Sequence, residues 1–432
     1  MSTRFTWIIG FAVLVSIGLL VACGSNYKAS EDGLIIVPSQ GQDIVQSFSF
    51  NLNKGNVSTI HSNPLIPGPP DQGFPASIVL DPTGSFAYVT SVNTPDPASA
   101  PCTKTSVIAT FAINSEGSVS ALGSTSLSNN LIPVALAMDS AGKYLYVANS
   151  SACVLNAQPA GTPGTISVFS VGTNASLTEI AGSPFGVPAI TGGGPANLVA
   201  LALTPTLFNV QYAPCTANQP PTTEYMYVAD AENNGVWQFS VNTSSGVPTL
   251  VPYTSSQPAA PAGSVPSGVA VDPCNRFVYV SNQLSNNVSG YIICNKVLLP
   301  DCPVANGSLA PVVGSPFPAG NGPGPLVVSP QDTAVYVLDK SSTAAAGEIS
   351  AFKISYATGS LSPLNPATVT TGNTPVSIAI RSDNNWLFVT NNGSTSGNGS
   401  VSQYSVTPAT GALAPSGTGI LTDTYPWGLA VK

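Results

Sequence analysis

The final segment of the chain, residues 426–432 with the sequence PWGLAVK, repeats a pattern that occurs six times earlier. The pattern is a proline, two small or variable residues and an aliphatic alternation. Each earlier copy continues into a second strand-like segment, whereas this copy stops. The first segment of that second type, residues 34–39, has no copy of the pattern before it. The two ends of the chain therefore supply complementary halves of one unit, which predicts a ring closed by pairing the first and last segments in one sheet.

The pattern begins at seven prolines along the chain. These are Pro75, Pro133, Pro195, Pro266, Pro325, Pro375 and Pro426. A third segment with period-two alternation follows each second segment, as in residues 349–354, and a hairpin turn then leads to a weaker fourth segment, as in residues 357–361. Four short antiparallel strands, repeated seven times at about 50 to 80 residues, are the sequence form of a β-propeller. We therefore expect one all-β domain over residues 33–432, a seven-bladed propeller of four-stranded blades.

Three short motifs in the repeats point to a family. The second strand ends in Tyr-Val-x-Asn (residues 279–282), the turn before it reads Asp-Pro-x-Gly (residues 81–84), and the hairpin reads Thr-Gly-x-Leu (residues 410–413). These motifs resemble those of YVTN-repeat and lactonase-type seven-bladed propellers, a family that includes 6-phosphogluconolactonase-like and carboxymuconate-cyclase-like proteins. The resemblance covers residues 33–432 and implies the propeller fold. For activity, it implies hydrolysis of lactones.

The N-terminus indicates export. Arg4 precedes an apolar run over residues 5–22, and the run ends in Leu-Val-Ala-Cys, which resembles the lipobox of bacterial lipoproteins. We expect a signal peptide over residues 1–22, lipidation of Cys23, and a polar tether up to residue 32. An uncleaved membrane anchor is the alternative, because about 18 apolar residues can just span a bilayer. Both interpretations place the propeller outside the cytoplasm, and Gly24 permits an outer-membrane or periplasmic location in the cell envelope.

The remaining cysteines are even in number, which favours disulfides in an oxidising compartment. Strand direction alternates within a blade, so loops joining strands two and three share one face and turns joining strands one and two share the other. Three pairs follow from this placement, each within a blade or between neighbouring blades. They are Cys102 with Cys153, Cys215 with Cys274, and Cys294 with Cys302. Different pairing among the last four cysteines is the alternative.

Charge excludes one class of partner. Only 7% of the residues are charged, the net charge is −8, and there are 11 basic residues. Nucleic-acid binding needs clustered lysine and arginine, so we do not expect it. The 43% hydrophobic content argues against disorder. We expect a monomer whose surface is solubilised by hydroxyls and amides.

Catalytic residues are hard to find in this chain. Lactone hydrolysis needs a base or a metal to activate water and a donor for the oxyanion. In catalytic members of the family, histidine, arginine and glutamate facing the central cavity are the usual candidates. The only histidine here, His61, falls in the outermost strand of the first blade. The absence of an axial histidine removes both a Ser-His-Asp triad and a histidine-ligated metal.

The loop face, where strands two and three are joined, is the expected binding surface. The candidate binding residues on it are Asp43, Asp71, Asp230, Glu232, Asp339, Lys340, Asp423 and Trp427. Residues 230–235 resemble half a calcium loop, but the twelfth position is Val241 instead of an acidic ligand. We therefore expect no cofactor, with calcium as the alternative.

Together these features predict a lipid-anchored, extracytoplasmic propeller that acts as a non-catalytic scaffold. Its loop face would bind a protein, a glycan or a small molecule. The alternative is a lactonase-like hydrolase that uses acidic residues and a divalent ion. A purely structural envelope protein is a third interpretation.

Overall fold

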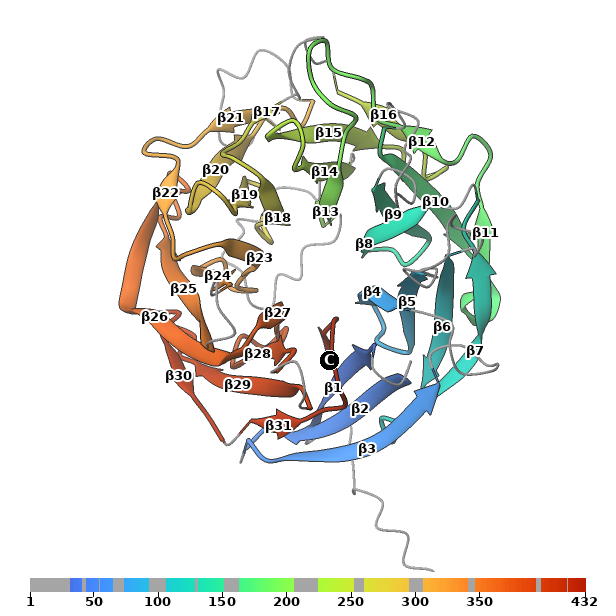
Figure 1. The fold of residues 1–432 in the computed structure, drawn as a ribbon, viewed down its shortest axis with the longest axis vertical. Coiled ribbons are helices and arrows are strands. Elements are labelled where there is room, and N and C mark those ends of the chain that lie inside the picture. The colour runs from blue at the N-terminus through green and yellow to red at the C-terminus, as the bar shows by residue number, and fades with distance from the viewer. Residues whose placement is uncertain are drawn as a thin grey trace, which may run out of the picture.

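The chain forms seven antiparallel sheets arranged in a ring around a central axis (Figure 1). The computed structural model describes residues 32–40, 44–53, 55–64, 74–92, 106–128, 131–150, 163–205, 224–251, 260–294, 306–340, 346–393, 398–417 and 419–432. This arrangement confirms the predicted seven-bladed propeller. We number the blades in chain order and give their strands from the axis outward.

The first four blades contain the strands up to β17. Blade 1 has β32 (Ala430–Val431), β1 (Asp32–Ser39), β2 (Ile44–Asn51) and β3 (Val57–Pro64). Blade 2 has β4 (Phe74–Leu80), β5 (Phe86–Val92), β6 (Val107–Ile113) and β7 (Val119–Ser126). Blade 3 has β8 (Ile132–Met138), β9 (Tyr144–Ser150), β10 (Thr165–Val171) and β11 (Leu177–Glu179), with η2 (Thr173–Ala175) in its hairpin and β12 (Phe185–Gly186) beside β10. Blade 4 has β13 (Leu198–Leu203), β14 (Glu224–Asp230), β15 (Gly235–Val241) and β16 (Pro248–Leu250), with β17 (Ala260–Pro261) beside β15.

The last three blades follow the same plan. Blade 5 has β18 (Pro266–Val271), β19 (Phe277–Asn282), β20 (Asn287–Ile293) and β21 (Leu309–Pro311), with β22 (Phe317–Pro318) beside β20. Blade 6 has β23 (Pro323–Val328), β24 (Ala334–Asp339), β25 (Ala346–Ile354) and β26 (Leu361–Asn373). Blade 7 has β27 (Pro375–Ile380), β28 (Trp386–Asn391), β29 (Ser400–Val406) and β30 (Leu413–Pro415), with β31 (Ile420–Leu421) beside β29.

The ring closes as the terminal segments predict. In blade 1, β32 pairs antiparallel with β1, with Ile36 opposite Ala430, and Pro426 bridges to Ser39. The backbone N–H of Leu34 donates to the Lys432 carbonyl at 3.0 Å. Pairing of the two termini removes the open edge that the ring would otherwise present.

Several predictions from the sequence concern residues outside this description. Residues 1–31, with the signal peptide and Cys23, are among them. So are Cys102, Cys153, Cys215 and Cys302 and the acidic residues Asp43 and Asp71. Cys274 and Cys294 are described and buried, but their predicted partners are not, so the three pairings stay predictions. In the described part of the chain, no helix is long and apolar enough to cross a membrane.

A β-bulge begins the inner strand of most blades. In blade 7, for example, Pro375 pairs with Asn391 and Ser377 pairs with the adjacent Thr390, so Val376 has no partner. The same shift occurs in blades 2, 3, 4, 5 and 6. It begins at Leu198 in blade 4, after the predicted Pro195, and at Pro323 in blade 6, before the predicted Pro325. An extra residue in a strand re-aims its side chain, and here the unpaired residue faces the central channel.

Tyrosine hydroxyls connect neighbouring blades. The tyrosine of the Tyr-Val motif donates to the carbonyl oxygen of the glycine in the next blade's hairpin. The four bonds are Tyr146 to Gly246 (3.2 Å), Tyr227 to Gly307 (2.8 Å), Tyr279 to Gly359 (2.9 Å) and Tyr336 to Gly411 (2.6 Å). The two family motifs are therefore the two halves of one inter-blade contact, since a buried hydroxyl is stable only with a partner.

Three blades lack this bond. The second strand of blade 1, β1, contains no tyrosine, and blades 2 and 7 lack the bond for local reasons. Blade 7 has Phe388 in place of the tyrosine, and the Gly55 carbonyl accepts a bond from Gln403 Nε2 at 3.0 Å instead. Tyr88 of blade 2 faces a hairpin that contains η2 where other blades have the glycine turn, and its buried hydroxyl has no hydrogen-bond partner among the residues that the structure describes. Burial raises the pKa of Tyr88 to about 12.

This difference predicts opposite outcomes for one kind of substitution. Tyr279→Phe should lower the free energy of unfolding by about 1–3 kcal/mol, because it leaves the Gly359 carbonyl without its donor. Tyr88→Phe should leave stability unchanged or raise it, since the hydroxyl that it removes is buried without a partner. Urea unfolding of both variants measures the difference. Equal losses would show that the tyrosines act through packing alone.

Candidate binding site

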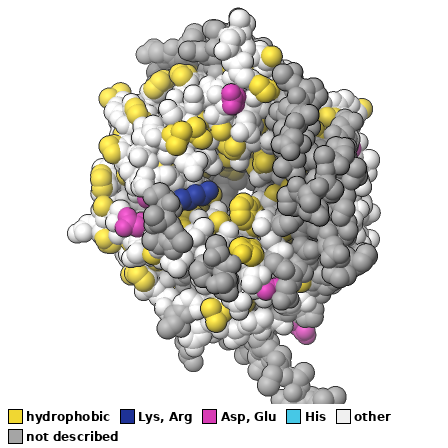
Figure 2. All heavy atoms as spheres, viewed as in Figure 1, with side chains coloured by type: hydrophobic (Ala, Val, Ile, Leu, Met, Phe, Trp, Pro, Cys, Tyr) yellow, Lys and Arg dark blue, Asp and Glu magenta, His cyan; other side chains and the backbone are white. Residues whose placement is uncertain are grey.

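The mouth of the central channel on the loop face is a cavity of about 940 Å³. Its inner wall is a bulge ring made by the unpaired residues of the inner strands, with Trp427 at the matching place in blade 1. The members of the bulge ring that line the cavity are Ala76, Val134, Val199, Ser267, Val376 and Trp427. Figure 2 shows the centre of the molecule hollowed, with apolar side chains and a basic side chain beside the hollow.

A second layer of the wall, which we call the rim, comes from the residues that directly follow the second strands, or end them. The rim residues that line the cavity are Gln40, Val92, Ala231, Gln283 and Lys340. Asn197 adds a further amide. The cavity therefore has an apolar floor and a polar edge, a composition that is common in small-molecule sites.

Lys340 is the single ionisable side chain among the described residues that line this cavity. Its backbone N–H donates to the Gly322 carbonyl at 3.1 Å, which fixes the start of the side chain. Burial lowers the pKa of the Lys340 ammonium. No described carboxyl or imidazole lines the cavity, so the functional groups of its described lining are amides, serine hydroxyls, one aromatic ring and one amine.

Asp230, a predicted binding residue, is fully buried. Its carboxylate accepts bonds from the Asn197 backbone N–H (2.9 Å), Asn233 Nδ2 (2.8 Å) and Trp237 Nε1 (2.9 Å). Both carboxylate oxygens of Asp230 thus accept hydrogen bonds from N–H groups. These bonds link the end of the second strand to Asn197, which lies just before the inner strand of the same blade. This arrangement stabilises the blade and does not resemble a calcium site, whose ligands all direct oxygens at one ion.

Asp339 occupies the equivalent place in blade 6 and is also buried, with 3% of its surface exposed. It accepts a bond from Ser350 Oγ at 2.6 Å, on the side of the strand away from Lys340. Burial raises the pKa of Asp339 to about 7, and the nearby Glu348 carboxylate adds to this rise while Ser350 opposes it. Like Asp230, it acts within the blade.

The other predicted residues separate into those in the cavity and those outside it. Trp427, one of the predicted binding residues, lines the cavity with 39% of its surface exposed. Glu232 is exposed and Asp423 is half-buried, and neither lines the cavity. His61 lies on β3, the outermost strand of blade 1, where the sequence places it.

Sequence reasoning missed a buried acid on the opposite face, where turns join strands one and two. Glu224, at the start of β14, is fully buried, and the one polar group of the described chain that offsets the burial of its carboxyl is the Ser140 backbone. Burial is the main cause that raises the pKa of Glu224 to about 8; the nearby Asp139 carboxylate adds to the rise and the Ser140 backbone opposes it. Glu224 approaches Asp139 from the neighbouring blade, so no local sequence pattern signals the pair.

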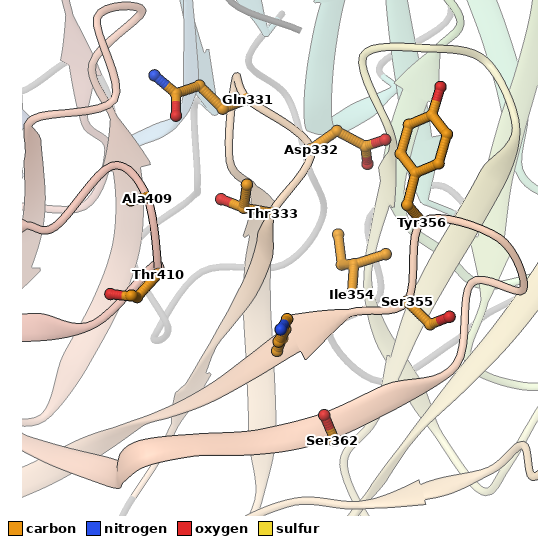
Figure 3. Close-up of a pocket in the computed structure, with 10 residues that line it drawn as sticks. Gln331, Asp332, Thr333, Ile354, Ser355, Tyr356, Ser362, Ala409 and Thr410 are labelled. Carbon is orange, nitrogen blue, oxygen red and sulfur yellow. The ribbon is translucent and has the colours of Figure 1, made fainter. Parts of the chain in front are cut away.

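A second cavity of about 760 Å³ lies on that opposite face, between blades 6 and 7. Figure 3 shows Gln331, Asp332 and Thr333 on one side of it and Ala409 and Thr410 on another. Its described lining is mostly apolar, and the polar side chains in that lining do not converge on one point.

Beside this cavity, Arg276 ties blades 5 and 6 together. Its guanidinium contacts Asp272 at 3.2 Å, pairs with Asp332, donates to the Tyr356 carbonyl at 2.7 Å and stacks 3.8 Å from the Tyr356 ring centre. Oxygens of Asp272 and Asp332 and the Cys274 sulfur lie within 4.8 Å of one another. Because the guanidinium already contacts both carboxyl groups, the group is an ion-pair cluster, in which a metal would have to displace the arginine.

Comparison with known proteins agrees with this architecture. Solved structures with the same fold include two proposed 6-phosphogluconolactonases. The one from Bacteroides fragilis has 17% sequence identity and a TM-score of 0.66, and the match covers 94% of this chain and 100% of that chain. The one from Bacteroides uniformis has 17% identity and a TM-score of 0.68, and the match covers 93% of this chain and 100% of that chain. The periplasmic gluconolactonase of Pseudomonas aeruginosa is also similar, with 15% sequence identity, a TM-score of 0.64, and a match that covers 93% of this chain and 99% of that chain. At these identities the likeness shows the fold alone. No curated protein sequence matches significantly.

The family model described as "Lactonase, 7-bladed beta-propeller" matches residues 42–157 and 305–424, more than half of the chain. Its matched segments include the second-strand and hairpin motifs of the first blades and of the last two. The chain therefore belongs to the lactonase family of seven-bladed β-propellers.

Proposed function

We propose that the protein is a lipid-anchored, extracytoplasmic binding protein that holds a small organic ligand at the mouth of its channel. The observation that carries this proposal is the composition of the cavity: a bulge ring that is apolar except for Ser267, amides at the rim and a single ionisable group in the described lining. Such a site can bind and orient a ligand. It offers no described carboxyl or imidazole to act as a general base beside it.

The second candidate function is lactone hydrolysis, which family membership favours. In this cavity the amine of Lys340 would have to activate water, because it is the one titratable group in the described lining. Fold alone is a weak argument for activity, since one fold hosts many functions. We therefore rank binding first.

The envelope location and the disulfides belong to the same proposal. Lipidation at Cys23 would hold the propeller at a membrane surface, and the pairs Cys102–Cys153, Cys215–Cys274 and Cys294–Cys302 would stabilise its loops. Peptide mapping without reduction should recover these three pairs. Cys23→Ala should release the protein from the membrane fraction, whereas retention there would favour an uncleaved anchor.

A cavity-filling substitution tests binding at the channel mouth. Native mass spectrometry of the protein purified from its own cells should show a bound small molecule, and Val199→Trp in the bulge ring should abolish it. Ala409→Trp, in the cavity on the opposite face, is the matched control and should retain it. Loss from both variants, or from neither, would contradict binding at this site.

A further inference from the structure

We propose that the ligand of the channel mouth is a small organic anion whose charged group is bound by the Lys340 ammonium. This inference rests on the proposed binding function and specifies the chemistry of its ligand. Three observations support it: the position of Lys340 in the ring, the space made for its side chain, and the lack of a counter-ion for it among the described residues.

The first observation is that one blade breaks the neutrality of the rim. Strand register makes the rim positions equivalent from blade to blade, because each follows the residue that pairs with the start of the inner strand. The other rim residues in the cavity are Gln40, Val92, Ala231 and Gln283, all neutral. A seven-fold repeat thus presents a positive charge at one point of its mouth, and this asymmetry gives a ligand a fixed orientation.

The second observation is that the inner strand of the same blade leaves room for the lysine. A Cβ at Gly324 would lie 2.8 Å from Lys340 Cε and 3.6 Å from Cδ, so any side chain there would displace the lysine. In blade 6, Gly324 and Pro325 are both unpaired between Pro323 and Leu326, and Gly324, directly after the first paired residue, holds the place that Val376 has in blade 7. In the other bulges that position carries a side chain, as in Val134, Ser267 and Val376. Gly324 and Lys340 therefore depend on each other. Because position 324 has no side chain, the aliphatic part of Lys340 packs over the inner strand and its ammonium reaches the cavity.

The third observation is that the ammonium has no acidic partner in the described part of the chain. The ion pairs there join Arg276 to Asp272 and Asp332, and Arg381 to Asp383. The adjacent Asp339 points to the other side of its strand and binds Ser350. A half-buried ammonium without a counter-ion is destabilised by desolvation, which lowers its pKa, and a bound anion would reverse that cost.

Trp427 provides the measurement, because it lines the same cavity and is partly exposed, whereas Trp237 is fully buried. Three probes of similar shape are titrated against its fluorescence: benzoate, phenyl phosphate and neutral benzamide. We expect at least one anion to bind tenfold or more tightly than benzamide, and the tighter of the two identifies a carboxylate or a phosphate ligand. Trp427→Phe should remove the signal, which shows that the response comes from the cavity.

Lys340→Met keeps the length of the side chain and removes the charge. It should abolish the tenfold preference for the anion and leave benzamide affinity unchanged, while Lys353→Met, at an exposed lysine of the opposite cavity, should change neither. Equal affinity for anion and amide in the wild type would overturn the inference and leave the binding function standing. A wild type that gives no saturable response to any of the three probes would overturn both.

Discussion

Replacing Arg276 with methionine should lower the free energy of unfolding by about 3–5 kcal/mol. The guanidinium lies between Asp272 and Asp332, whose side chains are fully buried, and is itself only 4% exposed. Its removal leaves two carboxylates in the interface of blades 5 and 6 without a counter-ion. Burial raises the pKa of Asp272 and the Arg276 charge opposes that rise, so the loss should be greater at pH 8 than at pH 5.

The matched control is Arg381→Met. Arg381 pairs with Asp383, but the two side chains are 16% and 22% exposed, so the same change of residue type should cost about 1 kcal/mol or less. Urea unfolding at pH 5 and pH 8 compares the two variants. Similar losses in both would mean that the buried cluster contributes no more than a surface pair.

The second large change in the free energy of unfolding should come from Glu224→Gln, and its size should depend on pH. The pKa of Glu224 is about 8 in the folded protein, against an ordinary value of 4.5. The folded state therefore holds a proton that the unfolded state has lost, and the stability of the wild type should fall as pH rises from 4.5 to 8. The slope is about 1.4 kcal/mol per pH unit from this one group.

Glutamine cannot ionise, so the stability of the variant relative to the wild type should increase by several kcal/mol between pH 5 and pH 8. The cost of burying the glutamine amide is the same at both pH values, so it cancels when the stability difference at pH 5 is subtracted from that at pH 8. Glu116→Gln, at an exposed glutamate, should show no such change. A Glu224→Gln variant whose stability follows the wild type at every pH would show that the carboxyl ionises freely in the fold.

The blade count and the ring closure could be predicted from the sequence because both depend on local periodicity. A proline and an aliphatic alternation recur in each repeat and a Tyr-Val strand in most of them, and the unmatched halves at residues 34–39 and 426–432 have one simple arrangement. The partner of each tyrosine could not be predicted in the same way. The bond from Tyr279 to Gly359 joins separate blades, and the motif alone does not show which hairpin lies against which strand.

The residues of the candidate site were even harder to predict from the sequence than the tyrosine contacts. Asp230 is the last residue of a second strand and Lys340 directly follows one, so the two positions are adjacent in the repeat and the sequence predicts both on the same face. In the fold, alternation along the strand turns Asp230 into the blade and Lys340 toward the channel. The bulge ring also depends on a register shift, which is set by pairing with the second strand and leaves no mark in composition.

Turnover of a lactone tests most directly whether this family member binds or catalyses. Hydrolysis of glucono-1,5-lactone, followed by acid release, should proceed at the spontaneous rate in the presence of the purified protein, and Lys340→Met should not change it. Saturable turnover that is lost in Lys340→Met would contradict the account and make the channel mouth an active site.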